Sequence, residues 1–305
     1  MKRKVSISTG TLQKIYGDIG MLEVVRKMGA DAIDFSTDGS RWDYRNPQSI
    51  YSKSDEEMIA YFSEIRRRAD ELGLEIGQTH GRLPGFKNIP EEDDALIENA
   101  RRDCLAASVL GAPVVIIHSV TTMYLGADAD PRLMHDLNDR MFRRILPFAK
   151  EYGVKIAMET FGDAPGLGCC DFFGQADELI ASFERLAAEG DNASYLCYCM
   201  DTGHTNKAVR FNQPTPGDLI RRFGHNLAAL HLHDNNGLTD QHKLPMTGTI
   251  DWNDVFDALD EVGYQGNYNL ELLLTHFGKG FEEQTAAFGI ALMRHMLKSR
   301  YGEDA

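Results

Sequence analysis

Short runs rich in valine, isoleucine and alanine recur along the chain and alternate with longer segments of helical periodicity. The runs are predicted strands, and they cover Val5–Thr9, Ala32–Ser36, Glu75–Thr79, Pro113–His118, Val154–Thr160, Tyr195–Asp201, Leu227–Asp234 and Asn267–Leu272. Eight strands alternating with eight helical segments indicate a parallel sheet with crossover helices, and the number of units matches a (β/α)8 barrel, the TIM barrel of the α/β class. An open doubly wound sheet is the alternative, but the chain has no GxGxxG phosphate turn.

Residues at the predicted helix ends support this division. Ser54-Asp55-Glu56-Glu57 has the order of a capping box, and Pro131 suits the first turn of a helix. Several helical segments stop at a glycine that leads into the next strand, as at Gly73, Gly111 and Gly153. Glycine adopts the left-handed conformation that commonly follows a helix end. Since no linker or low-complexity segment interrupts the pattern, we expect one domain over residues 1–305.

Potential metal ligands occupy the ends of six consecutive predicted strands. These ends carry His80, His118, Glu159, Asp201, the pair His231 and His233, and Glu271. Catalytic groups of a TIM barrel sit at the C-terminal ends of its strands. Strand alternation predicts that Leu230 and Leu232 face the helices while His231 and His233 face the barrel axis. A single inward histidine is more often an ordinary core residue, so the joint pattern carries the prediction.

Converging carboxylates also limit the chemistry of such a site. A carboxylate on an apolar strand is costly unless it is paired or bound to a metal, and several on one axis require a cation. A mixed set of histidines and carboxylates suits Zn, Mn, Fe or Co better than calcium. We therefore expect a transition-metal site at one end of the barrel.

Composition narrows the partners and the compartment. The 305 residues carry a net charge of -14, which argues against a phosphate backbone as the main ligand. No apolar run has the length of a signal peptide or a membrane span. The odd number of cysteines, five, indicates reduced thiols and a cytoplasmic location. Cys197 and Cys199 alternate along a predicted strand and are expected to be small core residues.

The motifs at these strand ends resemble a known family. They are Met158-Glu159-Thr160, Met200-Asp201-Thr202-Gly203-His204, His231-Leu232-His233-Asp234-Asn235, Asp240-Gln241-His242, Pro245-Met246-Thr247-Gly248-Thr249-Ile250-Asp251-Trp252 and Leu270-Glu271-Leu272. Together they are similar to the xylose isomerase-like barrel superfamily, in particular to its sugar isomerase and epimerase branch. Endonuclease IV belongs to the same superfamily. The resemblance covers nearly the whole chain and is densest from Val154 to Leu272.

The resemblance implies one divalent ion, Mn, Co, Zn or Mg, held by Glu159, Asp201, His231 and Glu271. His231 is favoured over His233 because the family's ligand histidine stands three residues before the aspartate, here Asp234; the chain has His233 where the family often has lysine. Glu159 and Glu271 would exchange the proton of the substrate carbon on opposite faces. The residues expected to contact substrate are His204, His80, His118, His233, Trp42 and Asp240.

Endonuclease IV supplies the first alternative. There, positions resembling His80, His118, His204, Asp240 and His242 join the other four residues to hold three zinc ions, and all nine residue types are present here. A phosphodiesterase acting on abasic DNA is therefore one alternative, although the acidic charge and the Ile250-Asp251-Trp252 segment count against it. A lyase or dehydratase on the same metal site and a sugar-binding protein without activity are the others.

These observations together predict a cytoplasmic, metal-dependent isomerase or epimerase. Its expected substrate is a small sugar or sugar derivative, with nucleic acid and membranes disfavoured as partners. A homo-oligomer is possible. The resemblance extends to a superfamily with several chemistries, so the identity of the sugar is not fixed by it.

Overall fold

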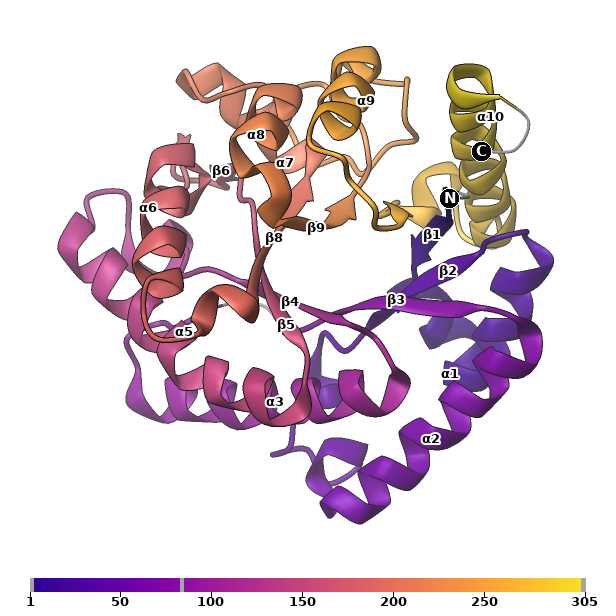
Figure 1. The fold of residues 1–305 in the computed structure, drawn as a ribbon, viewed down its shortest axis with the longest axis horizontal. Helices are drawn as coiled ribbons and strands as arrows, with labels where there is room; N and C mark the ends of the chain where they lie inside the picture. Colours follow the sequence, from indigo (N-terminus) through magenta and orange to yellow (C-terminus); the bar gives the residue numbers. More distant parts are fainter. Residues whose placement is uncertain (1–2, 83–84, 303–305) are drawn as a thin grey trace.

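Eight parallel strands surround a central axis in the computed structural model, which describes residues 3–82 and 85–302 (Figure 1). The strands are β1 (Val5–Ser8), β2 (Ala32–Ser36), β3 (Glu75–His80), β4 (Val114–His118), β5 (Lys155–Glu159), β8 (Leu196–Asp201), β9 (Leu227–His231) and β10 (Tyr268–Leu270). They pair in the order β10-β1-β2-β3-β4-β5-β8-β9. A parallel bridge between Leu232 and Leu270 joins the two ends of this order. The predicted TIM barrel is confirmed.

Helices form the outer ring of the barrel (Figure 1). They are α1 (Gly10–Lys27), α2 (Asp55–Leu72), α3 (Pro90–Leu110), α4 (Thr122–Leu125), α5 (Pro131–Tyr152), α6 (Ala176–Ala187), α7 (Thr202–Ala208), α8 (Pro216–Phe223), α9 (Trp252–Glu261) and α10 (Glu282–Tyr301). Ser54 and Glu57 form the predicted capping box, and Pro131 opens α5. Gly73, Gly111 and Gly153 end their helices in the left-handed conformation, as expected. None of the described helices combines the length and the hydropathy that a membrane crossing requires.

The connections depart from strict alternation of one strand with one helix. A short hairpin, β6 (Asp163–Ala164) and β7 (Cys169–Cys170), stands between β5 and α6, and α7 and α8 both stand between β8 and β9. Two-residue strands leave no periodic signal in a sequence, so the hairpin was not predicted. Residues 1 and 305, the ends of the predicted domain, lie outside the described part of the chain, and the single domain stays a prediction.

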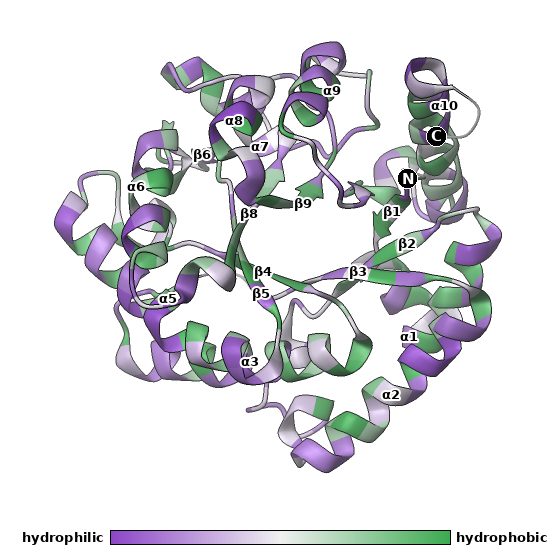
Figure 2. Cartoon of the chain, viewed as in Figure 1, coloured by the Kyte–Doolittle hydropathy of each residue, from purple (hydrophilic) through white to green (hydrophobic). Residues whose placement is uncertain are grey.

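Apolar side chains pack in two separate layers. The larger layer lies between strands and helices and contains Met158, Leu230, Leu232 and Leu270, so the predicted outward direction of Leu230 and Leu232 is confirmed. Figure 2 shows the hydrophobic strands inside a ring of helices whose outer surfaces are mostly hydrophilic. A smaller cluster comprises Val114, Ile116, Ala157, Cys197, Cys199 and Ala229, which alternate with these outward-facing residues along β4, β5, β8 and β9 and therefore fill the barrel interior. The expected role of Cys197 and Cys199 as small core residues is thus confirmed.

Polar residues occupy the other side of the barrel interior. Ser6 donates a hydrogen bond to Asn269 at 2.8 Å, and Asn269 in turn donates to Ser8 and Asp34. These four residues come from β1, β2 and β10, and Ser6, Asp34 and Asn269 are fully buried. The interior therefore has an apolar wall and a polar wall, and one buried carboxylate, Asp34, stands on the polar one.

Candidate active site and metal centre

Parallel pairing brings the predicted site residues to one mouth of the barrel. His118 is in register with Glu159, and Asp201 is in register with His231. Two residues before each of these four positions stands a small or apolar inward residue: Ile116, Ala157, Cys199 and Ala229. Because side chains of a strand alternate between its faces, this apolar layer lies directly beneath the polar one. The polar groups therefore have a dry floor and open toward the C-terminal mouth.

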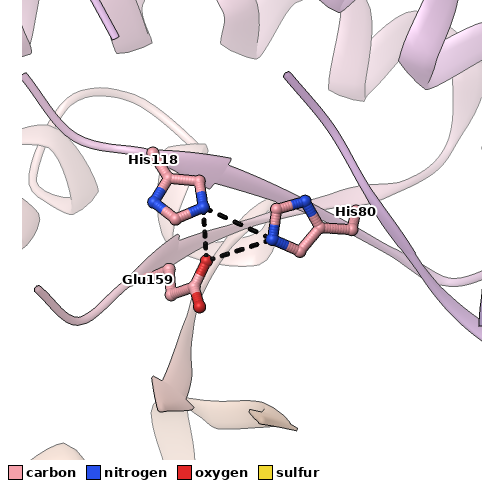
Figure 3. Close-up of side chains that lie close together, drawn as sticks. All are labelled: His80, His118 and Glu159. Atoms are coloured by element: carbon pink, nitrogen blue, oxygen red, sulfur yellow. Dashed lines mark hydrogen bonds and ion pairs between the residues drawn. The ribbon is translucent and has the colours of Figure 1, made fainter. Parts of the chain in front are cut away.

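His80, His118 and Glu159 form the innermost group, and their side chains point toward one another (Figure 3). His118 Nε2 lies 2.8 Å from Glu159 Oε2 and 3.3 Å from His80 Nε2. His80 Nε2 lies 3.6 Å from the same Oε2 atom. Ligands about 2.0–2.2 Å from a tetrahedral ion stand roughly 3.3–3.6 Å apart. The three atoms therefore already have spacings close to those of a metal ligand set.

His231 is held through both nitrogens of its ring. Its Nδ1 atom lies 2.6 Å from Glu159 Oε1 and 3.4 Å from Glu271 Oε2, and its Nε2 atom lies 3.0 Å from Asp34 Oδ2. Asp34 was not among the predicted site residues. Nδ1–H donates to Glu159 and Nε2–H donates to Asp34. When the Nδ1 hydrogen leaves, the hydrogen bond to Asp34 keeps the Nε2 hydrogen in place and directs the Nδ1 lone pair toward the two glutamates. This is the arrangement in which a histidine acts as a metal ligand.

Asp201 makes its contacts with a different histidine. Its carboxylate accepts a hydrogen bond from the backbone N–H of His204 at 2.6 Å, which caps α7, and Oδ1 lies 2.9 Å from His233 Nε2. The structure thus places His231 beside Glu159 and Glu271, and His233 beside Asp201. Both histidines reach a carboxylate of the expected metal set, so the preference for His231 stays a prediction.

A second group lies closer to the surface and contains His204, Asp240 and His242; we call it the outer cluster. His204 Nε2 and His242 Nε2 lie 3.3 Å and 3.2 Å from the same atom, Asp240 Oδ2. The His242 ring also stacks on His233 at 3.9 Å between centroids. His242 has a φ of 43°, which is uncommon for a residue other than glycine and is typical of functional sites when the surroundings enforce it.

The electrostatics of the site keep the carboxylates of Glu159 and Asp201 charged. Burial raises the pKa of Glu159, but the neighbouring His118 and His231 outweigh it and hold this pKa well below its usual range. Burial likewise raises the pKa of Asp201, and His204 and His233 reverse the effect. Burial lowers the pKa of His80, yet the Glu159 carboxylate raises it to about 10. Positive charge beside these carboxylates is therefore strongly favourable, whether a protonated histidine or a metal ion supplies it.

The donor set fits a divalent cation. Ion pairs of Asp34, Glu159, Asp201 and Glu271 within the described residues involve histidines and no lysine or arginine. Glu159 Oε2, Asp34 Oδ1 and His233 Nδ1 are buried and make no hydrogen bond of acceptable geometry within the same residues. Buried polar atoms without partners are costly, and several nitrogen and oxygen donors around one point suit a transition metal.

Two aromatic residues depart from the sequence prediction. Trp42, expected to cover the substrate, is 2% exposed and packs on Phe35, Tyr51 and Phe62 on the helix side of β2. The structure therefore does not bring Trp42 to the site; its loop turns back into the outer core, where an indole buries more apolar surface. Phe161, which was not predicted, lies there instead, with its half-buried ring 5.2 Å from that of His118. Its place directly after the Glu159-Thr160 motif was the only available signal.

A family model described as xylose isomerase-like TIM barrel matches residues 22–295. Among curated proteins, the uncharacterized protein y4fM of Sinorhizobium fredii is 28% identical over 166 residues, covering 54% of this chain and 49% of the relative. The chain thus spans about half the length of the curated relatives it matches.

Solved structures with a similar fold include several sugar enzymes. A D-tagatose 3-epimerase-like protein has a TM-score of 0.73 at 20% identity, covering 99% of this chain and 100% of its own. D-psicose 3-epimerase in the presence of D-fructose has a TM-score of 0.69 at 16% identity, with 96% and 99% covered. The IolI protein with a bound zinc atom has a TM-score of 0.67 at 17% identity, with 97% of each chain covered. At these identities the likeness establishes the fold.

Proposed function

The chain belongs to the xylose isomerase-like TIM barrel family, and from this premise we propose that it is a metal-dependent isomerase or epimerase of a sugar or sugar-like substrate. The observation that carries the proposal is that two glutamates contact the same two histidines. Glu159 and Glu271 both approach His231 Nδ1, at 2.6 Å and 3.4 Å, and both approach His80 Nε2, at 3.6 Å and 4.0 Å. Two carboxylates around one point are what transfer of a proton between the two faces of a carbon requires.

The resident ion in this proposal is held by Glu159, Asp201, His231 and Glu271. A divalent cation there supplies Lewis acidity, which stabilises negative charge on substrate oxygens. The fit of the donor set described above supports its presence, and so does the zinc atom of the similarly folded IolI protein. The proposed ion is Mn, Co, Zn or Mg.

Side chains of the protein transfer the proton and contact the substrate. The Glu271 side chain is 23% exposed, whereas that of Glu159 is 1% exposed, so Glu271 faces the open mouth from which substrate enters. In the proposed reaction one carboxylate takes the proton from carbon and the other returns a proton to the opposite face. His204 and His242 lie at the outer rim, where their Nε2 atoms contact Asp240 and would donate to substrate hydroxyls in its place. Phe161 offers an apolar surface for the carbon face of the sugar.

A phosphodiesterase related to endonuclease IV is the second candidate. The grouping of His80, His118 and Glu159, and of His204, Asp240 and His242, favours it, because both groups have ligand spacings. The net charge of -14 opposes it, since binding to a phosphate backbone depends on lysine and arginine. A lyase or dehydratase would use the same first proton transfer and is separated from an isomerase only by its product.

Glu159→Gln and Glu271→Gln test the proposal. Each variant loses a carboxylate that accepts a proton, so we expect exchange of a substrate C–H proton with deuterium oxide to fall by about 10²–10⁴-fold. The measurement is deuterium incorporation by NMR across a panel of ketoses, with metal content determined for each variant. Asp94→Asn, on the exposed face of α3, is the control and should keep wild-type exchange. Unchanged exchange in both glutamine variants would contradict the assignment.

A further inference from the structure

A buried lysine, which no sequence pattern assigned to the site, contacts the outer cluster. Lys207 lies on α7 and is 3% exposed. Its Nζ atom lies 3.2 Å from Asp240 Oδ1 and 3.1 Å from Asp163 Oδ1. The ammonium group therefore contacts the same carboxylate, that of Asp240, as His204 and His242 do.

The neighbouring backbone leaves room for this lysine. A Cβ atom at Gly162 would lie 2.9 Å from Lys207 Cε and 2.7 Å from the carbonyl oxygen of His204. Any larger residue at position 162 would thus displace either the lysine or the start of α7. The glycine and the ion pairs fix the ammonium group between the β6 hairpin and the loop after β9.

Charge balance separates the outer cluster from the inner site. Asp34, Glu159, Asp201 and Glu271 pair only with histidines within the described residues, so the inner site lacks permanent positive charge. In the outer cluster, Asp240 pairs with Lys207, and Asp163 pairs with Lys207 and Arg210. Two carboxylates there face two permanent cations. A divalent ion would add two charges to a region that is already neutral, beside the buried ammonium group of Lys207 that repels it.

We propose that Lys207 is the resident cation of the outer cluster, so that His204, Asp240 and His242 work without a metal ion. Backbone carbonyls of Thr160 and Glu271 hold Nδ1 of His204 and of His242, and both Nε2 atoms contact Asp240 Oδ2. Hydroxyl groups of a polyol substrate then take over the Nε2 contacts with Asp240, with the histidines as donors. This inference rests on the proposed function and specifies its substrate contacts: the metal is confined to the inner site, and the outer cluster recognises sugar hydroxyls. In the opposite arrangement, Lys207 fixes Asp240 Oδ1 while Oδ2 and the two histidines hold a metal.

Metal stoichiometry distinguishes these arrangements. The full-length protein is stripped with a chelator and titrated with Zn²⁺ against a chromophoric competitor, and bound zinc per chain is confirmed by elemental analysis. We expect Asp240→Asn and His242→Gln to bind as many equivalents as the wild type. Loss of one equivalent in either variant would overturn the proposal. We expect Lys207→Met to gain one equivalent, and the double variant Lys207→Met/Asp240→Asn to lose it again.

Two further comparisons make each outcome decisive. Lys243→Met removes a neighbouring lysine that is only partly buried and is the matched control, so its stoichiometry should equal that of the wild type. A folded Lys207→Met protein that gains no zinc would show that the lysine does not keep the metal out. If Lys207→Met does not fold, the Asp240→Asn and His242→Gln measurements still decide the matter.

The experiment also separates this inference from the proposed function. A protein that loses zinc in Glu159→Gln, keeps it in Asp240→Asn, and exchanges no proton on any ketose contradicts the function and supports the inference. A protein that exchanges ketose protons but loses one zinc in Asp240→Asn supports the function and overturns the inference.

Discussion

The position of a single buried carboxylate, Asp34, decides how His231 can act. The His231 ring is fully buried and is contacted at Nε2 by Asp34 and at Nδ1 by Glu159. Asp34 is itself oriented by hydrogen bonds from Ser8 and Asn269. A histidine whose far nitrogen is bound by a carboxylate is fixed in both ring orientation and tautomer. Asp34 is therefore a positioning residue for the proposed metal ligand.

Asp34→Asn tests this role. The amide keeps the size of the side chain but weakens the acceptor and adds a donor, so the His231 ring loses its enforced tautomer. We expect the affinity for Mn²⁺ or Zn²⁺ to fall by about 10–100-fold. The measurement is a chelator competition, accompanied by nitrogen-15 NMR of labelled histidine to read the His231 tautomer.

A matched control for this variant is Asp103→Asn. Asp103 is also buried, but it accepts its hydrogen bond from Tyr51 and has no contact with His231. Its metal affinity should equal that of the wild type. Wild-type affinity in Asp34→Asn, or an unchanged tautomer, would show that Asp34 is only a core residue.

The pattern of a carboxylate at the end of an apolar strand also occurs at one residue that was not predicted. Glu159 was found because a carboxylate stands at the end of an apolar strand. The same signal exists at Asp34, which lies between Ile33 and Phe35 in β2. Trp42 was misplaced for a different reason: the path of its loop depends on packing against Phe35 and Phe62, which no local pattern encodes.

Among the elements, the contact between the 3-10 helix η2 (Ile50–Ser52) and α3 contains a buried aspartate, Asp103. Tyr51 donates a hydrogen bond to Asp103 Oδ1 at 2.6 Å, while Asp103 Oδ2 is buried without a hydrogen-bond partner within the described residues. Burial raises the pKa of Asp103 to about 6, although the hydrogen bond from Tyr51 and the nearby Thr37 hydroxyl act in the opposite direction. The charged form of this side chain is therefore a cost to the folded state.

This pKa predicts a specific pH dependence of stability. An unfolded aspartate titrates near pH 4, so between about pH 4 and pH 6 the folded protein holds more protons than the unfolded chain. The contribution of Asp103 to stability therefore falls as pH rises through this window, by on the order of 3 kcal/mol. Asp103→Asn cannot ionise, so its free energy of unfolding relative to the wild type should increase by about this amount from pH 4 to pH 7. Urea unfolding at the two pH values measures the difference.

Asp94→Asn provides the comparison for this measurement, because Asp94 lies on the same helix and is exposed. Its difference from the wild type should not change over the same pH range. A constant difference for Asp103→Asn as well would mean that Asp103 titrates at its ordinary pKa.

Sequence periodicity predicted the elements well where they are long or carry capping residues. The start of α2 at Asp55 follows from its capping box, and the ends of α2 and α3 follow from Gly73 and Gly111. The ends of β2, β4 and β8 were placed correctly, and that of β3 was placed one residue short. The other four ends were placed one to three residues too far, because residues such as Thr160 continue the alternation after the sheet pairing stops. The β6–β7 hairpin depends on one antiparallel pairing across a tight loop, and four residues carry no period.

For the whole molecule, the site exists only when the barrel is closed. The four inner carboxylates belong to β2, β5, β8 and the residue after β10, so the chain segments that carry them are separated by up to 237 residues, from position 34 to position 271. The bridge between Leu232 and Leu270 brings the last of them beside His231. An unfolded chain cannot present these groups together, so a metal that binds them binds the folded state in strong preference.

Metal binding should therefore stabilise the entire barrel. A ligand at 100 times its dissociation constant, with affinity for the folded state only, adds about 2.7 kcal/mol to the free energy of unfolding. For a chain of 305 residues this corresponds to a rise in Tm of roughly 4 °C, measured by calorimetry after chelation and again after addition of Mn²⁺ or Zn²⁺. In the double variant Glu159→Gln/Glu271→Gln, addition of metal should raise the Tm less. Chelation should also lower its stability less, because two negative side chains that repel each other without the ion are neutral in the variant. An equal rise in that variant would place the stabilising ion elsewhere than on the barrel axis.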